Sequence, residues 1–359
     1  MVGTEKIKIE RVRESRLGRV NFKELMFGRT FTDHMFVADF KGGAWQNQRI
    51  APYGYMQISP ASPAIHYGQA IFEGLKAHRG QGNDVLVFRP MDNWKRMNIS
   101  AERMALAPIP EHLFMDGLIT LLDLDREWVP KQEGSSLYIR PFLFSGDEYI
   151  GIRPSVDFTF MIVASPSGAY YSQPLRVKIE TKYTRAVEGG TGFAKAAGNY
   201  AGAIYPTRIA QENGYHQLIW TDGKRHEYIE ESGTMNLMFI IDDTLVTPAL
   251  SDSILAGITR DSVLTLARHW GMKVEERKIG VNELVKGLQN GIVKEAFGVG
   301  TAATIARIEV IGYNGKDYTL PPTQDNGFSS RVYVELDKIK RGLKDDVFNW
   351  VLKVPSLAT

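Results

Sequence analysis

One lysine of this sequence stands among residues that rarely surround a lysine. Lys195 lies in "GGTGFAKAAGNY", between Ala194 and the small residues Ala196, Ala197 and Gly198. Small neighbours leave room for a flat molecule to approach the amine, and a lysine that loses its proton can attack a carbonyl carbon. The sequence therefore predicts a lysine that forms a Schiff base, in contrast to the solvated surface charge that most lysines provide.

A Schiff-base lysine serves two kinds of enzyme. In a cofactor-free aldolase the amine attacks the carbonyl of the substrate, whereas in a pyridoxal phosphate enzyme it holds the cofactor. The second kind also needs an anion site for the phosphate and a carboxylate for the pyridine nitrogen. The lysine alone leaves both possibilities open.

Two turns of the sequence could bind an anion. The stretch "ILAGITRDSVLTLARHWG" turns at Gly257 and begins a helix near Thr259, which directs the amides of Ile258 and Thr259 and the Thr259 hydroxyl outward. The stretch "FGVGTAA" follows an apolar strand and offers the Thr301 hydroxyl with free amides. Taken singly, each is equally typical of an ordinary cap or turn.

A candidate carboxylate lies in "HEYIEESGTMNLMF", where Glu230 and Glu231 end a predicted strand before a glycine turn. Side chains alternate along a strand, so one of the two acids can be buried while the other faces solvent. A buried carboxylate needs a cationic or hydrogen-bonded partner, and a protonated pyridine ring would be one. The alternative is an exposed acidic pair at a strand end.

The elements that must position these residues are mixed helices and strands. Short apolar runs predict strands and amphipathic stretches predict helices in both halves of the chain. We expect an α/β protein of the two-domain α+β type, with a small domain at 1–165, a linker at 166–174 in "SPSGAYYSQ", and a large domain at 175–359. The strands are expected in "HMFVADF", "VLVFRP", "SLYIRPFLF", "FTFMIVASP", "RVKIET", "HQLIWTD", "EYIEES" and "MNLMFII", and the helices in "DNWKRMNISAERMAL", "LFMDGLITLLDLDREWV", "NYAGAIYPTRIAQENG" and "TRDSVLTLARHWG".

Composition narrows the chemistry further. The 359 residues include 43 Lys and Arg against 41 Asp and Glu, without blocks of one sign, which argues against nucleic acid and membrane surfaces as partners. Cysteine is absent, so disulfides and thiolate chemistry are excluded, and the seven histidines show no metal-ligand spacing. The start has no apolar signal-peptide core, and no run of eighteen apolar residues follows. We expect a soluble, cytoplasmic protein without a metal.

Seven motifs together give the chain a close resemblance to a known family. In the family's order and spacing they are "FGRTFTDHMF", "HYGQAIFEGLKA", "SLYIRPF", "GGTGFAKAAGNY", "EESGTMNLMF", "AGITRDSV" and "FGVGTAAT". Over nearly its whole length the chain resembles the branched-chain amino acid aminotransferases, which are pyridoxal 5'-phosphate enzymes of fold type IV. The resemblance implies that fold and a homodimer. It also implies amino-group transfer from L-leucine, L-isoleucine or L-valine to 2-oxoglutarate, which gives branched-chain 2-oxo acids and L-glutamate by a ping-pong mechanism.

The resemblance also implies a role for each cofactor-site residue. Lys195 matches the lysine that forms the internal aldimine and then moves the proton of the substrate α-carbon. Glu231 matches the acid that faces the pyridine nitrogen, and Tyr200 matches the tyrosine that bonds the phenolic oxygen. The matches for phosphate binding are Arg96 in "DNWKRMNIS", Ile258, Thr259 and Thr301, with Arg185 in "KYTRAV" as a further candidate.

On the substrate side the resemblance implies an apolar pocket with one cation. Its walls would be Phe27, Tyr67 and Tyr138, and the α-carboxylate would meet Thr234 and the amide of Ala302. Arg140 matches the group that receives the γ-carboxylate of glutamate, and it stands two residues after Tyr138, on the same face of a strand.

The sequence departs from some members of the family in one motif. Some animal members carry a C-x-x-C pair after the GTA turn, whereas this chain has Ala303 and Ala306, so a thiol switch is excluded. The nearest alternatives are a D-amino acid aminotransferase and an aminodeoxychorismate lyase, although "YIRP", "HYG" and "GTMN" favour the branched-chain group. The more distant alternatives are the cofactor-free aldolase, which needs neither Glu231 nor Arg96, and a noncatalytic metabolite-binding protein.

Overall fold

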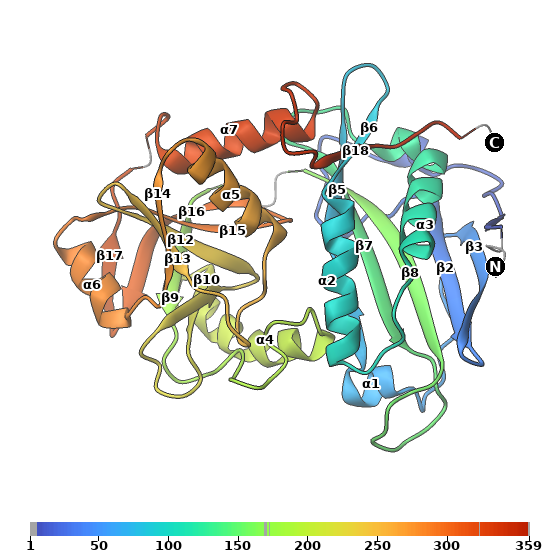
Figure 1. Ribbon diagram of the computed structural model, residues 1–359, viewed down its shortest axis with the longest axis horizontal. Coiled ribbons are helices and arrows are strands. Elements are labelled where there is room, and N and C mark those ends of the chain that lie inside the picture. Colours follow the sequence, from blue (N-terminus) through green and yellow to red (C-terminus); the bar gives the residue numbers. More distant parts are fainter. Residues whose placement is uncertain (1–5, 169–170, 172, 323, 358–359) are drawn as a thin grey trace. The chain divides into compact units, whose positions relative to one another are not determined.

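The computed structural model describes residues 6–168, 171, 173–322 and 324–357, which form two compact units (Figure 1). Unit 1 contains the described residues up to 168, residues 196–198 and residues 338–357. Unit 2 contains the described residues from 171 to 195 and from 199 to 337. The proposed linker at 166–174 includes residues 169, 170 and 172, which lie outside the described residues.

Unit 1 is built on one sheet in which strands from both ends of the chain pair. Its order is β1-β3-β2-β8-β7-β5-β6-β18, and β4 also pairs with β7. All pairings are antiparallel except that of β1 with β3. The strands are β1 (Lys8–Ile9), β2 (His34–Lys41), β3 (Ala44–Pro52), β4 (Ala70–Phe72), β5 (Leu75–Arg79), β6 (Val85–Phe88), β7 (Ser136–Ser145), β8 (Phe158–Ser167) and β18 (Val351–Lys353).

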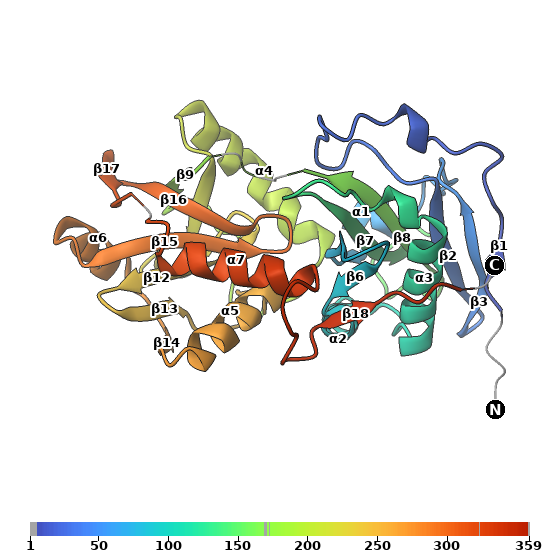
Figure 2. The same cartoon turned by 90° about the horizontal axis from the view of Figure 1, so that it is seen from above.

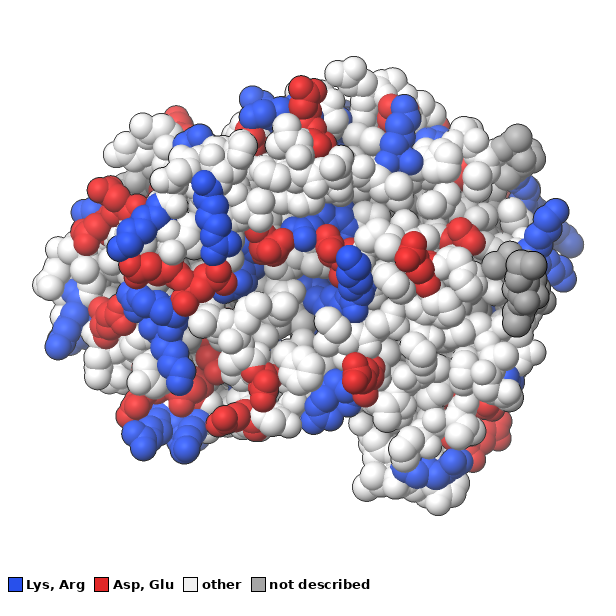
Figure 3. All heavy atoms as spheres, viewed as in Figure 1, with Lys and Arg blue, Asp and Glu red and all other residues white. Residues whose placement is uncertain are grey.

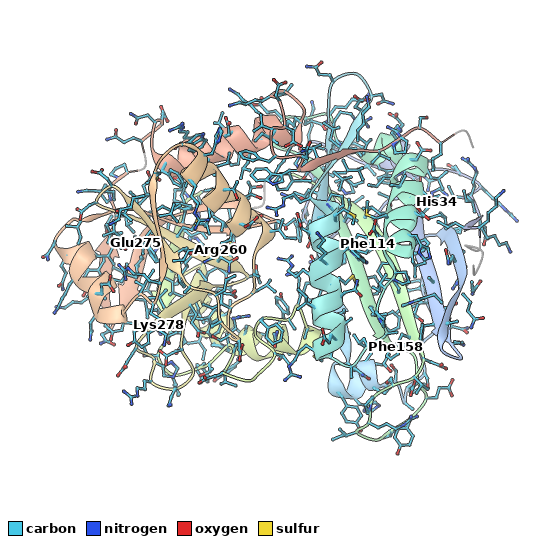
Figure 4. All side chains as sticks on the ribbon, in the orientation of Figure 1. His34, Phe114, Phe158, Arg260, Glu275 and Lys278 are labelled. Atoms are coloured by element: carbon cyan, nitrogen blue, oxygen red, sulfur yellow. The ribbon has the colours of Figure 1, made fainter. Side chains whose placement is uncertain are left out.

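Helices cover this sheet through a cluster of aromatic rings. The Phe114 ring of α3, labelled in Figure 4, stacks on Phe160 of β8 with 6.0 Å between centroids. The Phe36 ring of β2 lies 5.9 Å from the Phe160 ring. A Cβ atom at Gly117 would lie 2.8 Å from the Phe36 ring, so this glycine is what lets α3 approach β2. The helices of unit 1 are α1 (Pro63–Tyr67), α2 (Pro90–Arg103) and α3 (Glu111–Leu124), and short 3-10 turns lie at Leu17–Arg19 and Arg126–Trp128.

The sheet of unit 2 closes on itself. Its order is β11-β10-β9-β16-β15-β12-β13-β14, and β11 also pairs with β12, so the six strands from β11 to β12 form a ring. In that pairing Glu231 lies opposite Asn236. The strands are β9 (Leu175–Ile179), β10 (Gln217–Thr221), β11 (Ile229–Ser232), β12 (Met235–Ile241), β13 (Thr244–Pro248), β14 (Lys273–Arg277), β15 (Val293–Gly300), β16 (Thr304–Tyr313) and β17 (Lys316–Thr319).

Helices lie on both faces of this second sheet. Ala210 of α4 packs with Leu218 and Trp220 of β10, whereas Leu284 of α6 belongs to the core that contains Ile219. Because neighbouring residues of a strand point to opposite faces, α4 and α6 cover opposite sides of β10. The helices that lie wholly or mostly in unit 2, labelled in Figure 2, are α4 (Ala197–Glu212), α5 (Ile258–His269), α6 (Val281–Gln289) and α7 (Phe328–Lys340).

The helices and strands expected in the quoted motifs are present, and the α/β content is confirmed. The C-terminal segment differs from the expected domain extents. The sequence assigned it to the large domain, but Val351 of β18 pairs with Phe88 of β6, within the sheet of unit 1. Backbone hydrogen bonding along β6 therefore draws the last strand back to the first unit.

The visible surface carries charges of both signs side by side, as Figure 3 shows. Within the described part of the chain, none of the helices combines the length and the hydrophobicity that crossing a bilayer requires.

Candidate active site

Lys195 lies in the turn that leads into α4, and its amine faces a tyrosine of that helix. The Lys195 Nζ donates a hydrogen bond to the Tyr200 hydroxyl at 3.1 Å. The Asn199 side chain, which the sequence analysis missed, holds the turn by donating to the carbonyls of Thr191 at 2.7 Å and Ala194 at 2.8 Å. The turn therefore presents the lysine amine and the phenol together.

Glu231 is a buried carboxylate with partners on both oxygens. Its side chain is 5% exposed. Oε1 accepts hydrogen bonds from the Leu255 amide at 2.7 Å and from Asn236 Nδ2 at 3.2 Å, and Oε2 lies 3.1 Å from the Arg185 guanidinium. A buried charge needs such partners, and these contacts compensate the charge of Glu231 and fix the position of its carboxylate.

Glu230 corrects one expectation of the sequence analysis. Alternation allowed one acid of the pair to face solvent, but Glu230 and Glu231 are both buried, at 8% and 3% exposure. The Ser253 hydroxyl donates to Glu230, and burial raises the pKa of the Glu230 carboxyl above its usual range. Every residue of β11 is buried, because this strand pairs with a neighbour on each side in the closed ring and Ser253 contacts Glu230.

A cavity of about 340 Å³ in unit 2 brings several expected residues together. Tyr200, Glu231 and Thr234 line it, together with Arg185 and Asn236. Arg185 belongs to the carboxylate end of the site, because its guanidinium also donates to the carbonyl of Ser253. Among the described residues, no cluster of three or more His, Asp or Glu side chains is arranged to hold a metal ion.

The two expected anion-binding turns both lie in unit 2. Helix α5 begins at Ile258 after the N-cap residue Gly257, and Ile258 and Thr259 are buried. The beginning of a helix carries partial positive charge, which favours an anion at such a position. Thr301 and Ala302 lie in the turn that joins β15 to β16.

Strand pairing brings the second turn to the end of the sheet that carries the carboxylate. Asn236 pairs with Val299 near the end of β15, and Glu231 lies opposite Asn236 on the other side of β12. The turn at 301–302 follows β15 directly. It therefore lies at the same end of the strands as Thr234, which precedes β12.

Phe27, Tyr138 and Arg140, three of the expected substrate residues of unit 1, line a second cavity of about 370 Å³. Phe27 packs edge-on against Tyr138 at 4.8 Å between centroids, and Arg140 donates to the Tyr138 hydroxyl at 2.8 Å. The Arg140 guanidinium also lies 4.5 Å from the centre of the Phe72 ring. One face of β7 therefore carries an aromatic wall and a cation, as the spacing of the two residues predicted.

Sequence reasoning missed further walls of this cavity and placed one residue there that does not line it. Phe31 and Tyr53 stack at 4.6 Å, and their aromatic character was the available signal. Tyr67 ends α1 at 43% exposure and is not among the lining residues. The cavity walls that were not predicted are Gly28, Phe31, Met35, Tyr53, Gly54, Met56, Phe142, Met161, Val163, Ala164 and Ser165.

Arg96 is held by a fully buried acid within unit 1. Its Nε and Nη2 donate to the two carboxylate oxygens of Glu73 at 2.7 and 2.8 Å. Glu73 is 0% exposed, so the pair is shielded from water and the plane of the guanidinium is fixed. Glu73 was quoted in the motif "HYGQAIFEGLKA" but was given no role.

Comparison with known proteins identifies the family to which the chain belongs. The model of the amino-transferase class IV family matches residues 70–311. Branched-chain-amino-acid transaminase 1 of Bacillus subtilis (strain 168) is 44% identical over 335 residues, which cover 92% of this chain and 94% of that protein.

Two solved structures share the fold. The branched-chain aminotransferase of Thermoproteus uzoniensis with norvaline aligns at a TM-score of 0.75 with 25% identity, and the alignment covers 90% of this chain and 100% of that one. The enzyme of Thermobaculum terrenum, solved in its PLP form, aligns at 0.74 with 20% identity over 90% of this chain and 98% of that one. The resemblance inferred from the seven motifs is confirmed, and the chain belongs to the class IV aminotransferases of fold type IV, which use pyridoxal phosphate, and within them to the branched-chain-amino-acid aminotransferase family.

Proposed function

We propose that this chain transfers the amino group of L-leucine, L-isoleucine or L-valine to 2-oxoglutarate, in two half-reactions that give ping-pong kinetics. The products are the branched-chain 2-oxo acid and L-glutamate. The observation that carries the proposal is the 3.1 Å hydrogen bond from Lys195 to Tyr200 in the unit that also buries Glu231. Family membership supports the reaction class.

The residues of unit 2 fit pyridoxal 5'-phosphate. The cofactor needs an amine for its aldehyde, a donor for its phenolic oxygen, an anion for its ring nitrogen and donors for its phosphate. Lys195, Tyr200 and Glu231 supply the first three, and the start of α5 with Thr259 supplies the fourth. Arg185 Nε is buried without a hydrogen-bond partner among the described residues, so the site keeps one unused hydrogen-bond donor that a ligand could meet. The proposal assigns further phosphate contacts to Ile258, Thr301 and Arg96.

When bound, the cofactor supplies an electron sink for the α-carbon of the substrate. Lys195 holds the cofactor covalently between turnovers and, once released, moves the α-proton. The negative charge of Glu231 would keep the ring nitrogen protonated. The Tyr200 hydroxyl orients the Lys195 amine.

The substrate contacts are proposed from the family resemblance, and the lining of the cavity in unit 1 supports Phe27, Tyr138 and Arg140 among them. Phe27, Tyr67 and Tyr138 supply apolar contact for leucine, isoleucine or valine side chains. Arg140 receives the γ-carboxylate of 2-oxoglutarate, because its fork of donors matches a carboxylate. Thr234 and the Ala302 amide bind the α-carboxylate.

We further propose that the chain acts as a cytoplasmic homodimer. A homodimer is the commonest assembly for a soluble enzyme. Light scattering of the purified protein at several concentrations tests the dimer, which predicts a mass of twice the 40.3 kDa chain.

The function is tested by the absorbance spectrum of the protein with pyridoxal phosphate, recorded before L-leucine, after it, and after 2-oxoglutarate. We expect a visible band that leucine removes and 2-oxoglutarate restores. Lys195→Ala is expected to abolish the cycle, whereas Lys182→Ala, which removes an exposed lysine 5.2 Å from the Tyr183 ring, leaves it intact.

Other outcomes of this experiment would support the alternative functions. A band that D-alanine discharges and leucine does not would keep the cofactor and reject the substrate assignment. A protein that forms no band but cleaves aldols would indicate the cofactor-free aldolase, and one that forms no band and turns over nothing would indicate a binding protein.

A further inference from the structure

We propose that Asn236 is a positioning residue that keeps Glu231 and the beginning of helix α5 at a fixed separation. The inference rests on the proposed function, in which the ring nitrogen of the cofactor meets Glu231 and its phosphate meets the first turn of α5. Because both groups belong to one rigid molecule, the two protein groups must be held at a matching distance before binding.

The Asn236 amide lies at the centre of a triangle of hydrogen bonds. Its Nδ2 donates to Glu231 Oε1 at 3.2 Å and to the Leu255 carbonyl at 2.8 Å. The Leu255 amide donates to the same Glu231 oxygen at 2.7 Å. These bonds join β11, β12 and the segment that leads into α5, which begins three residues after Leu255.

Burial makes the triangle rigid. Asn236 is 6% exposed and Glu231 is 3% exposed, so water does not compete for these bonds, and a charged acceptor strengthens them. Both hydrogens of the Asn236 amide are used within the triangle. Asn236 lines the cavity but acts through Glu231, which makes it a positioning residue and not a catalytic one.

Gly257 supplies an independent observation for the same role. Its backbone has φ −69 and ψ 128, which every residue type adopts, so the conformation of the turn does not require glycine. A Cβ atom at this position would overlap Asn236 Oδ1. The absence of a side chain at the start of α5 therefore makes room for the Asn236 amide.

The first test compares a ligand that would contact both Glu231 and the first turn of α5 with ligands that would contact only one of them. Apoprotein carrying Asn236→Ala is titrated with pyridoxal phosphate, with inorganic phosphate and with pyridoxal, which lacks the phosphate. We expect the Kd of pyridoxal phosphate to rise about tenfold or more, while the Kd values of phosphate and pyridoxal change by less than about threefold. An equal loss for all three ligands would mean local damage and would overturn the proposal.

A matched control separates positioning from general destabilisation. Thr247→Val removes a buried hydrogen bond of 2.7 Å between the Thr247 hydroxyl of β13 and the Leu237 carbonyl of β12, and this bond does not involve Glu231. This variant is expected to lower the melting temperature and to leave the three Kd values unchanged. If Thr247→Val weakened cofactor binding as much as Asn236→Ala does, a specific role for Asn236 would be rejected.

A double-mutant cycle keeps the proposal testable even if Asn236→Ala folds poorly. Gly257→Ala displaces the Asn236 amide, so it should weaken pyridoxal phosphate by a similar factor. Once Asn236 is alanine the new methyl group has no amide to displace, so the double variant is expected to bind no more weakly than either single variant. Losses that multiply would show that the two positions act independently and would overturn the inference.

The result for the unmodified protein separates the two proposals. A chain that forms no band with pyridoxal phosphate contradicts the proposed function itself. A chain that forms the band and keeps the same Kd after Asn236→Ala and after Gly257→Ala retains that function, and only the positioning role fails.

Discussion

The guanidinium of Arg185 lies 3.1 Å from the carboxylate of Glu231, and the two side chains are only 7% and 5% exposed. Removing one partner of a buried pair leaves the other charge without compensation. We therefore predict that Arg185→Leu lowers the free energy of unfolding of the cofactor-free protein by about 3–5 kcal/mol. Urea unfolding with and without pyridoxal phosphate measures the loss, which should be smaller in the loaded protein because the ring nitrogen then supplies a second cation.

The control for this prediction is the exposed pair of Arg225 and Glu227, whose atoms are 3.9 Å apart. Arg225→Leu is expected to change the stability by less than about 1 kcal/mol, because solvent screens such pairs. Equal effects of Arg185→Leu and Arg225→Leu would contradict the role of the buried pair.

Tyr200→Phe is predicted to alter the chemistry of Lys195 with little effect on the fold. The variant loses the 3.1 Å hydrogen bond to the amine but keeps the ring. A hydrogen bond to a charged group contributes about 1.5–3 kcal/mol, so kcat/KM should fall about ten- to a hundredfold. Steady-state kinetics and a pH titration of the visible band measure this effect. Tyr205→Phe, on the same helix and 52% exposed, should behave like the unmodified protein, and an equal loss there would contradict the prediction.

Local patterns were sufficient for much of this architecture. The start of α5 was predictable from Gly257 and Thr259, and Lys195 could be proposed as a site residue from its small neighbours, because both inferences use residues adjacent in the chain. Alternation placed Tyr138 and Arg140 on one face of β7, where their side chains form a hydrogen bond.

Local sequence patterns could not predict the contacts between segments that lie far apart in the chain. Nothing near Arg185 indicates a partner 46 positions later at Glu231, and Asn236 has a role only because the segment at 255–257 folds against it. The burial of Glu230 depends on Ser253 in the same way. Strand β18 has three residues and no local signal for the sheet that it joins.

Arg140 is predicted to discriminate between the two substrates of the proposed reaction. Arg140→Met keeps an apolar side chain in the cavity of unit 1 but removes the charge that would bind the γ-carboxylate. The value of kcat/KM for 2-oxoglutarate should fall at least about tenfold, while the half-reaction with L-leucine changes by less than about threefold. Single-turnover measurements of each half-reaction provide the comparison. Equal losses for both substrates would assign Arg140 to the structure of the pocket.

His78 is predicted to make the protein less stable in acid. Both imidazole nitrogens are buried without a hydrogen-bond partner among the described residues, and burial, with the charges of Lys340, Lys76 and Arg341, holds the pKa of His78 well below 6.5. In the unfolded chain the ring takes up a proton below about pH 6.5, while the folded protein keeps it neutral. The unfolded state therefore binds more protons, and the stability falls as the pH decreases below that value.

The difference in proton binding between the folded and unfolded states at His78 sets the expected size of the pH effect on stability. If the folded ring stays neutral, one proton bound only by the unfolded chain removes about 2 kcal/mol of stability between pH 7 and pH 5. His78→Leu keeps an apolar side chain of similar bulk and removes this proton, so its stability should fall less over the same range, by about that amount. Urea unfolding at several pH values measures the slopes. His112→Gln, on the exposed face of α3, should keep the slope of the unmodified protein, and an unchanged slope in His78→Leu would show that His78 becomes protonated within the folded state.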